Sequence, residues 1–551
     1  MKKMLALFLA LVMMLSVLAA CNTEKPVETQ PKETQGSNTP ADTQPIETTA
    51  PVDPEAEKYG GHLDLTHGSS TTTLDPSKAT GTWNYMWTNM VYEPPLTRDT
   101  EGNIRPNVCE FELSEDMLTL KLWVREGVTF HDGSEVEIED VVASIQRAVH
   151  KSPRNYVSAY IENVTYDGDV ATITFKEYNE RTMYYIACPN AFLGVMPKEI
   201  AEKYSYESGE YITSVEDAIG TGPYKVVGFE VDVSVEFERY EGYVPVAEGY
   251  TGMAAPKKAY LDSITFHINK DANATNIALM SGQYDLKEGV DEDQYELLKQ
   301  AGIVNKSTKT QTCLFLEFNT YSDRLVSTSE DMRKAILAAI DIPELVQICM
   351  HGRYDTYCCP ATDAKYYTDA FETADYMGED NVELSKKYQA AAGYNGEAIL
   401  LSYPSSKLEF YTLIQSYLDA AGIKYEAKLM EAEAQKELYA DKAGAWDMEI
   451  TYPSINSTPG LISATIYNAN YNNPEKDAMV AKLGGLMAGS DEYIQAWYDL
   501  ADQIVDDAAI AFLGTANLVW SMDPDFNLEF DGMNTYFYNS YWTNPAEHGK
   551  K

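Results

Sequence analysis

Basic residues are scarce in this sequence. It has 42 Lys and Arg against 85 Asp and Glu, which gives a net charge of −43 over 551 residues. A chain this acidic repels the phosphates of nucleic acids and the head groups of anionic lipids. We therefore expect no nucleic-acid partner, and no membrane contact through the protein surface itself.

The signatures of common hydrolases and zinc sites are also missing. The chain has no HExxH, no GxSxG and no CxxC. Its seven His residues are scattered over His62, His67, His131, His150, His267, His351 and His548. We expect no enzyme, no metal site and no cofactor. A carboxylate pair for glycoside cleavage stays open, because Asp and Glu occur throughout the chain.

The N-terminal apolar run, LALFLALVMMLSVLA, follows Lys2 and Lys3 and is too short to span a membrane, which takes about 20 residues. The sequence that ends in Ala20 and Cys21 resembles a bacterial lipobox. That resemblance implies a signal peptide over 1–20 and lipidation of Cys21, which would hold the protein on the outer face of the cytoplasmic membrane. The alternative is an ordinary signal peptide with an incidental Cys.

The segment 21–57 is rich in Thr, Glu, Gln and Pro, and beyond Cys21 it has no aromatic residue and no Leu. Such a segment cannot bury enough apolar surface to offset its ordering entropy, so we expect a disordered tether. The remaining cysteines are scattered, and we expect mostly free, buried thiols, although the adjacent pair also allows a vicinal disulfide. They are Cys109, Cys188, Cys313, Cys349, Cys358 and Cys359.

A strand, a tight turn and a helix follow one another between Leu118 and Val149. Apolar residues alternate from Leu118 to Val124, Asp132-Gly133 is a turn dipeptide, and apolar residues then recur at helical spacing from Val141. The stretch REGVTFHDG between the strand and the helix places His131 beside Asp132, a pair that also occurs in acid–base centres and metal sites.

This order strongly resembles the extracellular solute-binding proteins of family 5, which include the oligopeptide- and dipeptide-binding proteins of ABC importers. Their hallmark reads here as Arg125 to Gly133, followed by Glu139-Asp140-Val141. Glu137 stands where the family usually has a capping Thr. In the family this motif is structural, so the resemblance implies that His131 is a hydrogen-bonded turn residue.

Other stretches carry the same resemblance in the same order. They are GTGPY at 220–224, ALMSGQYDL at 278–286, FLEFNT at 315–320 with MRKAILAAIDIPELV after it, and YNNPEKDAMV at 471–480. The VDVSVEFERY segment after GTGPY alternates apolar and polar residues from Val231 to Glu238, which predicts a half-buried strand. VTYDGDVATITF at 164–175 predicts a hairpin.

The resemblance implies an α/β fold with two lobes of the periplasmic-binding-protein type and an additional domain on the first lobe. We expect lobe I over 58–95, 219–282 and 506–548, the additional domain over 96–218, and lobe II over 283–505.

The implied function is capture of oligopeptides or dipeptides by lobe closure, as a monomer, for an ABC permease driven by a separate ATPase. Oligosaccharide binding is the alternative. Nickel or haem capture and a role as adhesin or signalling receptor are less favoured. The expected ligand-binding residues are Ser70, Thr71, Thr72, Trp83, Tyr85, Asn319, Tyr452, Ser454 and Asn456.

Asn456 bears on the ligand class. Peptide-binding members pair the peptide's α-amino group with an acidic residue, and the corresponding position here falls on Asn456, with Glu449 nearby. A neutral amide holds a cation less well than a carboxylate and suits a hydroxyl or an amide. This substitution is the reason the oligosaccharide alternative stays open.

Overall fold

The largest element of the computed structural model is a nine-stranded mixed sheet. The structure describes residues 55–550 except 79–81, 152–158, 188–192, 290–293, 352, 357–363, 444–445, 454–457, 461, 463–465, 467–468 and 531–534. The sheet runs in the order β16 (Met448–Thr451), β12 (Val304–Phe318), β17 (Ile510–Met522), β11 (Leu286–Glu288), β1 (His62–His67), β10 (Ser263–Ile268), β9 (Ser234–Arg239) and β8 (Tyr224–Glu230), with β13 (Tyr354–Thr356) paired to β17.

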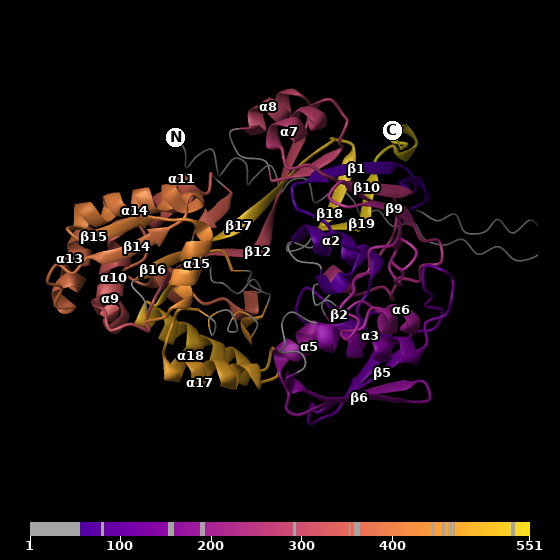
Figure 1. Ribbon diagram of the computed structural model, residues 1–551, viewed down its shortest axis with the longest axis horizontal. Coiled ribbons are helices and arrows are strands. Elements are labelled where there is room, and N and C mark those ends of the chain that lie inside the picture. Colours follow the sequence, from indigo (N-terminus) through magenta and orange to yellow (C-terminus); the bar gives the residue numbers. More distant parts are fainter. Residues whose placement is uncertain are drawn as a thin grey trace, which may run out of the picture. The chain divides into compact units, whose positions relative to one another are not determined.

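The long strands β12 and β17 lie side by side as an antiparallel pair (Figure 1). Strand β11 pairs with the end of β17 on one side and with β1 on the other. Because β1 is parallel to both β10 and β11, the three strands end at the same edge of the sheet. Strand β11 thus continues the sheet of β1 past residue 282, the expected end of that part of lobe I.

A separate four-stranded antiparallel sheet lies within 96–218. Its order is β4 (Cys109–Leu113), β5 (Thr119–Val124), β7 (Val170–Phe175) and β6 (Ile161–Asp167). Strands β6 and β7 form the hairpin expected from the sequence. Three two-stranded sheets complete the set: β2 (Leu96–Arg98) with β3 (Ile104–Pro106), β14 (Ile399–Tyr403) with β15 (Tyr425–Leu429), and β18 (Phe526–Phe530) with β19 (Thr535–Trp542).

The α-helices of the described residues are mostly short. They are α2 (Thr82–Val91), α3 (Ile138–Lys151), α5 (Glu180–Ile186), α6 (Lys198–Lys203), α7 (Ala272–Met280), α8 (Tyr295–Gln300), α9 (Leu325–Thr328), α10 (Glu330–Ala339), α11 (Ile342–Cys349), α12 (Ala370–Thr373), α13 (Val382–Ala391), α14 (Leu408–Ala421), α15 (Ala432–Ala440), α17 (Pro474–Gly484) and α18 (Asp491–Asp507). The mixture of helices and sheets confirms the α/β class.

Separate apolar cores hold these elements together. One packs α2 against β1 and β8–β10, and a second fills the space between the four-stranded sheet and α3. Two more lie on either side of the β12–β17 ribbon, one under α10, α11 and α14 and the other under α18. A chain of 551 residues is too long for a single apolar core, which accounts for the presence of several.

The strand–turn–helix motif is confirmed as β5, a turn and α3, and His131 is a structural residue in it. The backbone N–H of Gly220 donates to His131 Nδ1 at 3.2 Å, so Nε2 carries the proton and donates to the carbonyl oxygen of Gly222 at 3.0 Å. The ring also meets Tyr240 edge-on. Burial lowers the pKa of His131 to about 4. The imidazole is therefore neutral near pH 7 and joins the motif to the GTGPY loop.

The glycines of the GTGPY loop permit a close approach to the end of α2. A Cβ atom at Gly220 would lie 2.0 Å from the carbonyl oxygen of Val91, and one at Gly222 would lie 2.2 Å from that of Met90. Only glycine fits at these two positions, so the motif serves packing rather than phosphate binding.

One strand prediction is wrong in part. Strand β9 begins at Ser234, and Val231 and Val233 are 53% and 47% exposed in the turn that precedes it. Asp232 has a φ of 56°, which turns the chain between β8 and β9. The apolar–polar alternation therefore extends over the turn, where the backbone no longer follows the two-residue repeat of a strand.

The YNNP segment begins helix α17. Asn473 is the N-cap, and its Oδ1 accepts from the backbone N–H groups of Glu475 and Lys476, with Pro474 at the first helical position. Asn473 Nδ2 also donates to Asp507 at the end of α18. The motif thus fixes how two helices meet. Of the cysteines, Cys109, Cys313 and Cys349 are buried thiols outside any disulfide, as expected, and the other four lie outside the described residues.

Candidate ligand site at the carboxyl edge of the central sheet

The parallel strands β1, β10 and β11 end at one edge of the central sheet, the position where open α/β sheets bind ligands. The expected Ser/Thr cluster follows β1 directly. Ser70 is exposed and its Oγ accepts from Lys270 Nζ at 2.9 Å. Thr71 is buried and its hydroxyl donates to Asn84, whereas Thr72 is exposed. The cluster therefore offers Ser70 and Thr72 to solvent and uses Thr71 to hold its own loop.

Aromatic side chains from α2, β1 and β17 pack together beside this loop. Trp83, near the start of α2, stacks on His67 with ring centroids 4.5 Å apart and meets Trp520 of β17 edge-on at 5.5 Å. Tyr85 is partly buried on the same helix. Trp83 itself is buried, and it lies in the same apolar core as Met86, Trp87 and Met90 of this helix.

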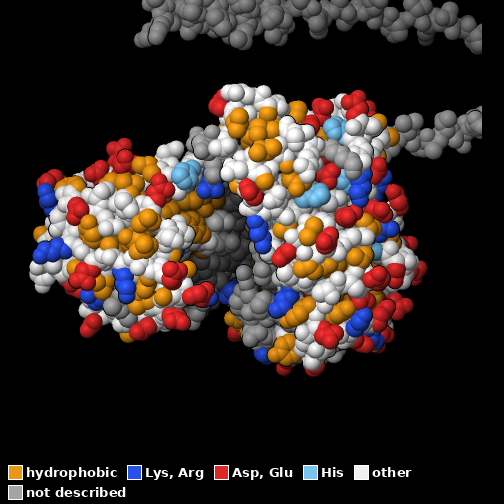
Figure 2. Space-filling model, turned by 45° about the horizontal axis from the view of Figure 1, so that its top comes forward, with side chains coloured by type: hydrophobic (Ala, Val, Ile, Leu, Met, Phe, Trp, Pro, Cys, Tyr) orange, Lys and Arg blue, Asp and Glu red, His pale blue; other side chains and the backbone are white. Residues whose placement is uncertain are grey.

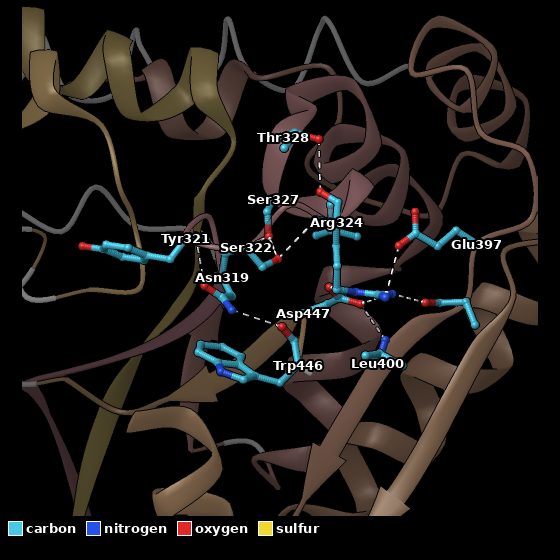
Figure 3. A network of polar contacts seen from close by, with 12 residues as sticks. Asn319, Tyr321, Ser322, Arg324, Ser327, Thr328, Glu397, Leu400, Trp446 and Asp447 are labelled. Atoms are coloured by element: carbon cyan, nitrogen blue, oxygen red, sulfur yellow. Dashed lines mark hydrogen bonds and ion pairs between the residues drawn. The ribbon is translucent and has the colours of Figure 1, made fainter. Parts of the chain in front are cut away.

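Asn319, which is also expected to bind ligand, holds backbone groups together in a separate polar network. Its side chain is fully buried: Nδ2 donates to the carbonyl oxygens of Lys442 and Trp446, and Oδ1 accepts from the N–H of Tyr321. Figure 3 shows it within a polar network in which Arg324 forms a two-point ion pair with Asp447. Asn319 thus ties the end of β12 to the segment that leads into β16.

The structure describes only some of the residues that are expected to contact the ligand from lobe II. Tyr452 directly follows β16 and is 41% exposed. Ser454 and Asn456 lie outside the described residues, as does Cys21. Glu449 is the acidic residue nearest to Asn456 in the sequence. Its Oε1 lies 3.6 Å from Lys407 Nζ, and burial raises the pKa of its carboxyl group to about 7. It is register partner to Glu317 on β12, so the two carboxyl groups share one face of the sheet.

Segments expected to belong to different domains touch at a buried carboxyl group. Glu180 on α5 accepts hydrogen bonds from the hydroxyl of Thr458 at 2.5 Å and from that of Tyr493 at 2.7 Å. Lys365 also donates to the carbonyl oxygen of Glu101 at 2.8 Å. These contacts join 96–218 to 283–505 without involving the expected ligand residues.

Residues 103–475 match the family model of the bacterial extracellular solute-binding proteins, family 5 (Middle). The chain belongs to this family.

Similar proteins agree with that assignment. The glutathione-binding protein GsiB of Escherichia coli strain K12 is 25% identical over 448 residues, which cover 75% of this chain and 81% of GsiB. The ABC transporter substrate-binding protein CtaP of Listeria monocytogenes superimposes with a TM-score of 0.72 at 20% identity, over 88% of this chain and 100% of CtaP. The oligopeptide-binding protein AppA of Bacillus subtilis, solved with a nonapeptide, gives 0.67 at 18%, over 88% and 99%. The two-lobe fold of this family is thereby confirmed.

The carboxyl edge also holds residues that sequence reasoning missed. His67, Glu288 and Trp520 accompany Trp83 at the carboxyl edge, although they lie in three separate strands. Glu288 follows the recognised SGQYD turn, so the motif pointed to its strand but not to its side chain. In the described part of the chain, no group of three or more His, Cys, Asp or Glu could hold a metal ion. No helix there is long and apolar enough to cross a membrane.

Proposed function

We propose that this protein captures oligopeptides or dipeptides and delivers them to an ABC permease that is driven by a separate ATPase. The observation that carries the proposal is the set of aromatic and hydrogen-bonding side chains at the carboxyl edge of the central sheet, in a chain of this family. The nonapeptide in AppA and the ligand named for GsiB support the same class.

Binding would proceed by hinge closure of the two lobes. The loop after β1, with Ser70 and Thr72, and the aromatic ring of Trp83 would contact the ligand from lobe I. Tyr452, Ser454 and Asn456 would approach from lobe II. The long antiparallel pair β12–β17 connects the two sides and is the natural place for the hinge. The protein would act as a monomer.

The decisive experiment is native mass spectrometry of residues 58–551 purified without refolding, followed by release and sequencing of the ligand. We expect short peptides. A second candidate, oligosaccharide binding, is favoured by the neutral Asn456 at the amine-pairing position and by the stacking surface of Trp83. Release of sugars instead of peptides would establish that alternative and contradict the first.

We also propose that Cys21 carries a lipid anchor and that 21–57 is the tether. Two or more acyl chains give stable membrane attachment, where one gives only marginal binding. Cys21→Ser should release the protein into the medium or leave the precursor uncleaved, as membrane fractionation and intact mass would report. A Cys21→Ser protein that stays on the membrane at its mature mass would contradict the anchor. Cys109→Ser, which changes a buried thiol of the body, should leave localisation unchanged.

A further inference from the structure

Four side chains from separate segments meet at the carboxyl edge of the central sheet. Glu288 of β11 is the register partner of Trp520 of β17, so the two side chains share one face. His67 lies one residue past the pairing of Thr66 with Lys287, which brings it next to Glu288 on the neighbouring parallel strand. Trp83 closes the group by stacking on His67 and by its edge contact with Trp520.

Three polar atoms in this group are inaccessible to solvent and have no hydrogen-bond partner among the described residues. They are Nε2 of His67, Oε2 of Glu288 and Nε1 of Trp520. Buried polar groups almost always find a partner in folded proteins, because an unmatched one loses its hydration without replacement. Three such atoms from three neighbouring strands are therefore a feature that needs an explanation.

The chemistry of the three atoms is distinct. The backbone N–H of Ser69 donates to Nδ1 of His67 at 3.1 Å, so the proton of the neutral ring lies on Nε2, which is a donor. Nε1 of Trp520 is a donor as well. Oε2 of Glu288 belongs to a carboxyl group whose pKa burial raises to about 8. The group thus contains two N–H donors and one carboxyl oxygen that have no hydrogen-bond partner among the described residues.

The lysines near Glu288 in sequence or in the sheet are engaged elsewhere. Lys287 points to the opposite face, where its Nζ donates to Asn276 and to the carbonyl oxygen of Ala272. Lys306, the register partner of Trp520 on β12, donates to the carbonyl oxygen of Leu528 at 3.0 Å. Within the described part of the chain, no cation offsets this buried carboxyl group, which favours a ligand that brings its own positive charge.

We propose that His67, Trp83, Glu288 and Trp520 form a subsite for the amino-terminal end of a peptide. The ammonium group would pair with Glu288, and the first carbonyl oxygen, three bonds from the ammonium nitrogen, would accept from His67 and Trp520. The ring of Trp83 would cover the cation. This assignment rests on the proposed function, and it places the amine-pairing acid in lobe I, where it offsets the neutral Asn456.

The test uses three pools of synthetic tetrapeptides built from Gly, Ala, Leu, Phe and Tyr. One pool has a free amino terminus, the second is N-acetylated, and the third is N-acetylated and carries one Lys. Wild-type protein, Glu288→Gln and Glu296→Gln are each equilibrated with every pool, and captured peptides are quantified by mass spectrometry. Glu296 is an exposed residue of α8, so its variant is a control that makes the same side-chain change at a distance.

We expect wild type and Glu296→Gln to enrich the free pool over both acetylated pools, and Glu288→Gln to lose that enrichment by roughly 10- to 150-fold, the value of one charge-assisted bond. Glu288→Asp, which keeps the carboxyl group on a shorter side chain, should lose less. Thermal unfolding of each variant verifies the fold. If Glu288→Gln does not fold, the enrichment of the free pool is compared between wild type and Glu288→Asp instead.

The outcomes separate the two proposals. Peptide capture with the same preference in wild type and Glu288→Gln would overturn the subsite while peptide binding stands. Equal capture of the Lys-containing acetylated pool and the free pool would overturn the assignment to the amino terminus. Capture of no peptide from any pool would contradict the proposed function, and the subsite with it.

Discussion

Individual buried histidines show how environment decides the role of a residue. His131 looked in the sequence like part of an acid–base pair with Asp132, but both its ring nitrogens are used by the backbone of the GTGPY loop. His67 has one nitrogen in use and the other without a partner among the described residues. The same residue type is thus a structural tie in one place and a candidate ligand contact in the other.

His131→Gln should lower stability and leave ligand affinity unchanged. Glutamine can replace one of the two backbone hydrogen bonds, and the other group is left unmatched at a cost of about 1–3 kcal/mol. Urea unfolding measures the loss, and titration with the co-purified ligand measures affinity. His150→Gln, which changes an exposed His of α3, is the control and should alter neither. Lost affinity at unchanged stability would contradict the structural role.

The stability of the ligand-free protein should fall in acid partly through His67. Burial lowers the pKa of His67 from its usual value of about 6.5 to about 4. The neutral form is therefore favoured in the folded state, and the contribution is complete above pH 6.5 and disappears as the pH falls toward 4. Urea midpoints between pH 7.5 and 4.5 should decline more steeply for wild type than for His67→Gln. Parallel declines would contradict this assignment.

At the scale of elements, short sequence motifs set where helices begin and how they meet. Asn473 caps α17 and also reaches Asp507 at the end of α18. Nε and Nη2 of Arg333, on α10, donate to the backbone carbonyl oxygen of the same Asp507. Three helices distant in sequence therefore converge on one residue, which explains why the segment 471–480 carries a recognisable motif.

Asn473→Ala should destabilise the protein by more than the loss of a helix cap alone. A cap is worth about 0.5–2 kcal/mol, and the bond to Asp507 adds a hydrogen bond to a carboxylate. The matched control is Asn381→Ala, which removes the cap of α13, where the Asn side chain accepts from Leu384. Calorimetric melting of both variants compares the two losses. Equal losses would show that the contact with Asp507 contributes nothing.

For the whole molecule, charge and inter-domain contact both bear on ligand capture. Asp and Glu side chains are spread over the face drawn in Figure 2, in keeping with the net charge of −43. Such a surface attracts cationic ligands and repels anionic ones. The bonds of Glu180 to Thr458 and Tyr493 hold together two parts of the chain that would have to separate if the lobes open.

Glu180→Ala should weaken ligand binding although Glu180 lies outside the expected site. Its removal leaves two buried hydroxyl groups without their acceptor, which disfavours the conformation in which these segments touch. We expect an affinity loss of about tenfold by calorimetric titration, from a bond worth about 1.5–3 kcal/mol. We also expect a larger radius of gyration by X-ray scattering of the liganded protein. Glu177→Ala, at an exposed position just before α5, is the control. Unchanged affinity would mean that the contact plays no part in closure.

The sequence by itself determined the family, the α/β class and the local elements of its motifs. The β5–turn–α3 unit, the β6–β7 hairpin and the cap of α17 are encoded by neighbouring residues, because turn chemistry, alternation and capping act over a few positions. The turn at Asp232 shows the limit of such patterns, since alternating Val residues continued past the end of the strand.

Only the tertiary structure decided which residues meet at the carboxyl edge of the central sheet. Asn319 directly follows β12, but its side-chain amide is hydrogen-bonded to the backbone of the segment that leads into β16. His67, Glu288 and Trp520 carry no motif of their own, and sheet register brings them together from β1, β11 and β17. Register depends on pairing between strands far apart in the chain, and no local pattern of residues specifies it.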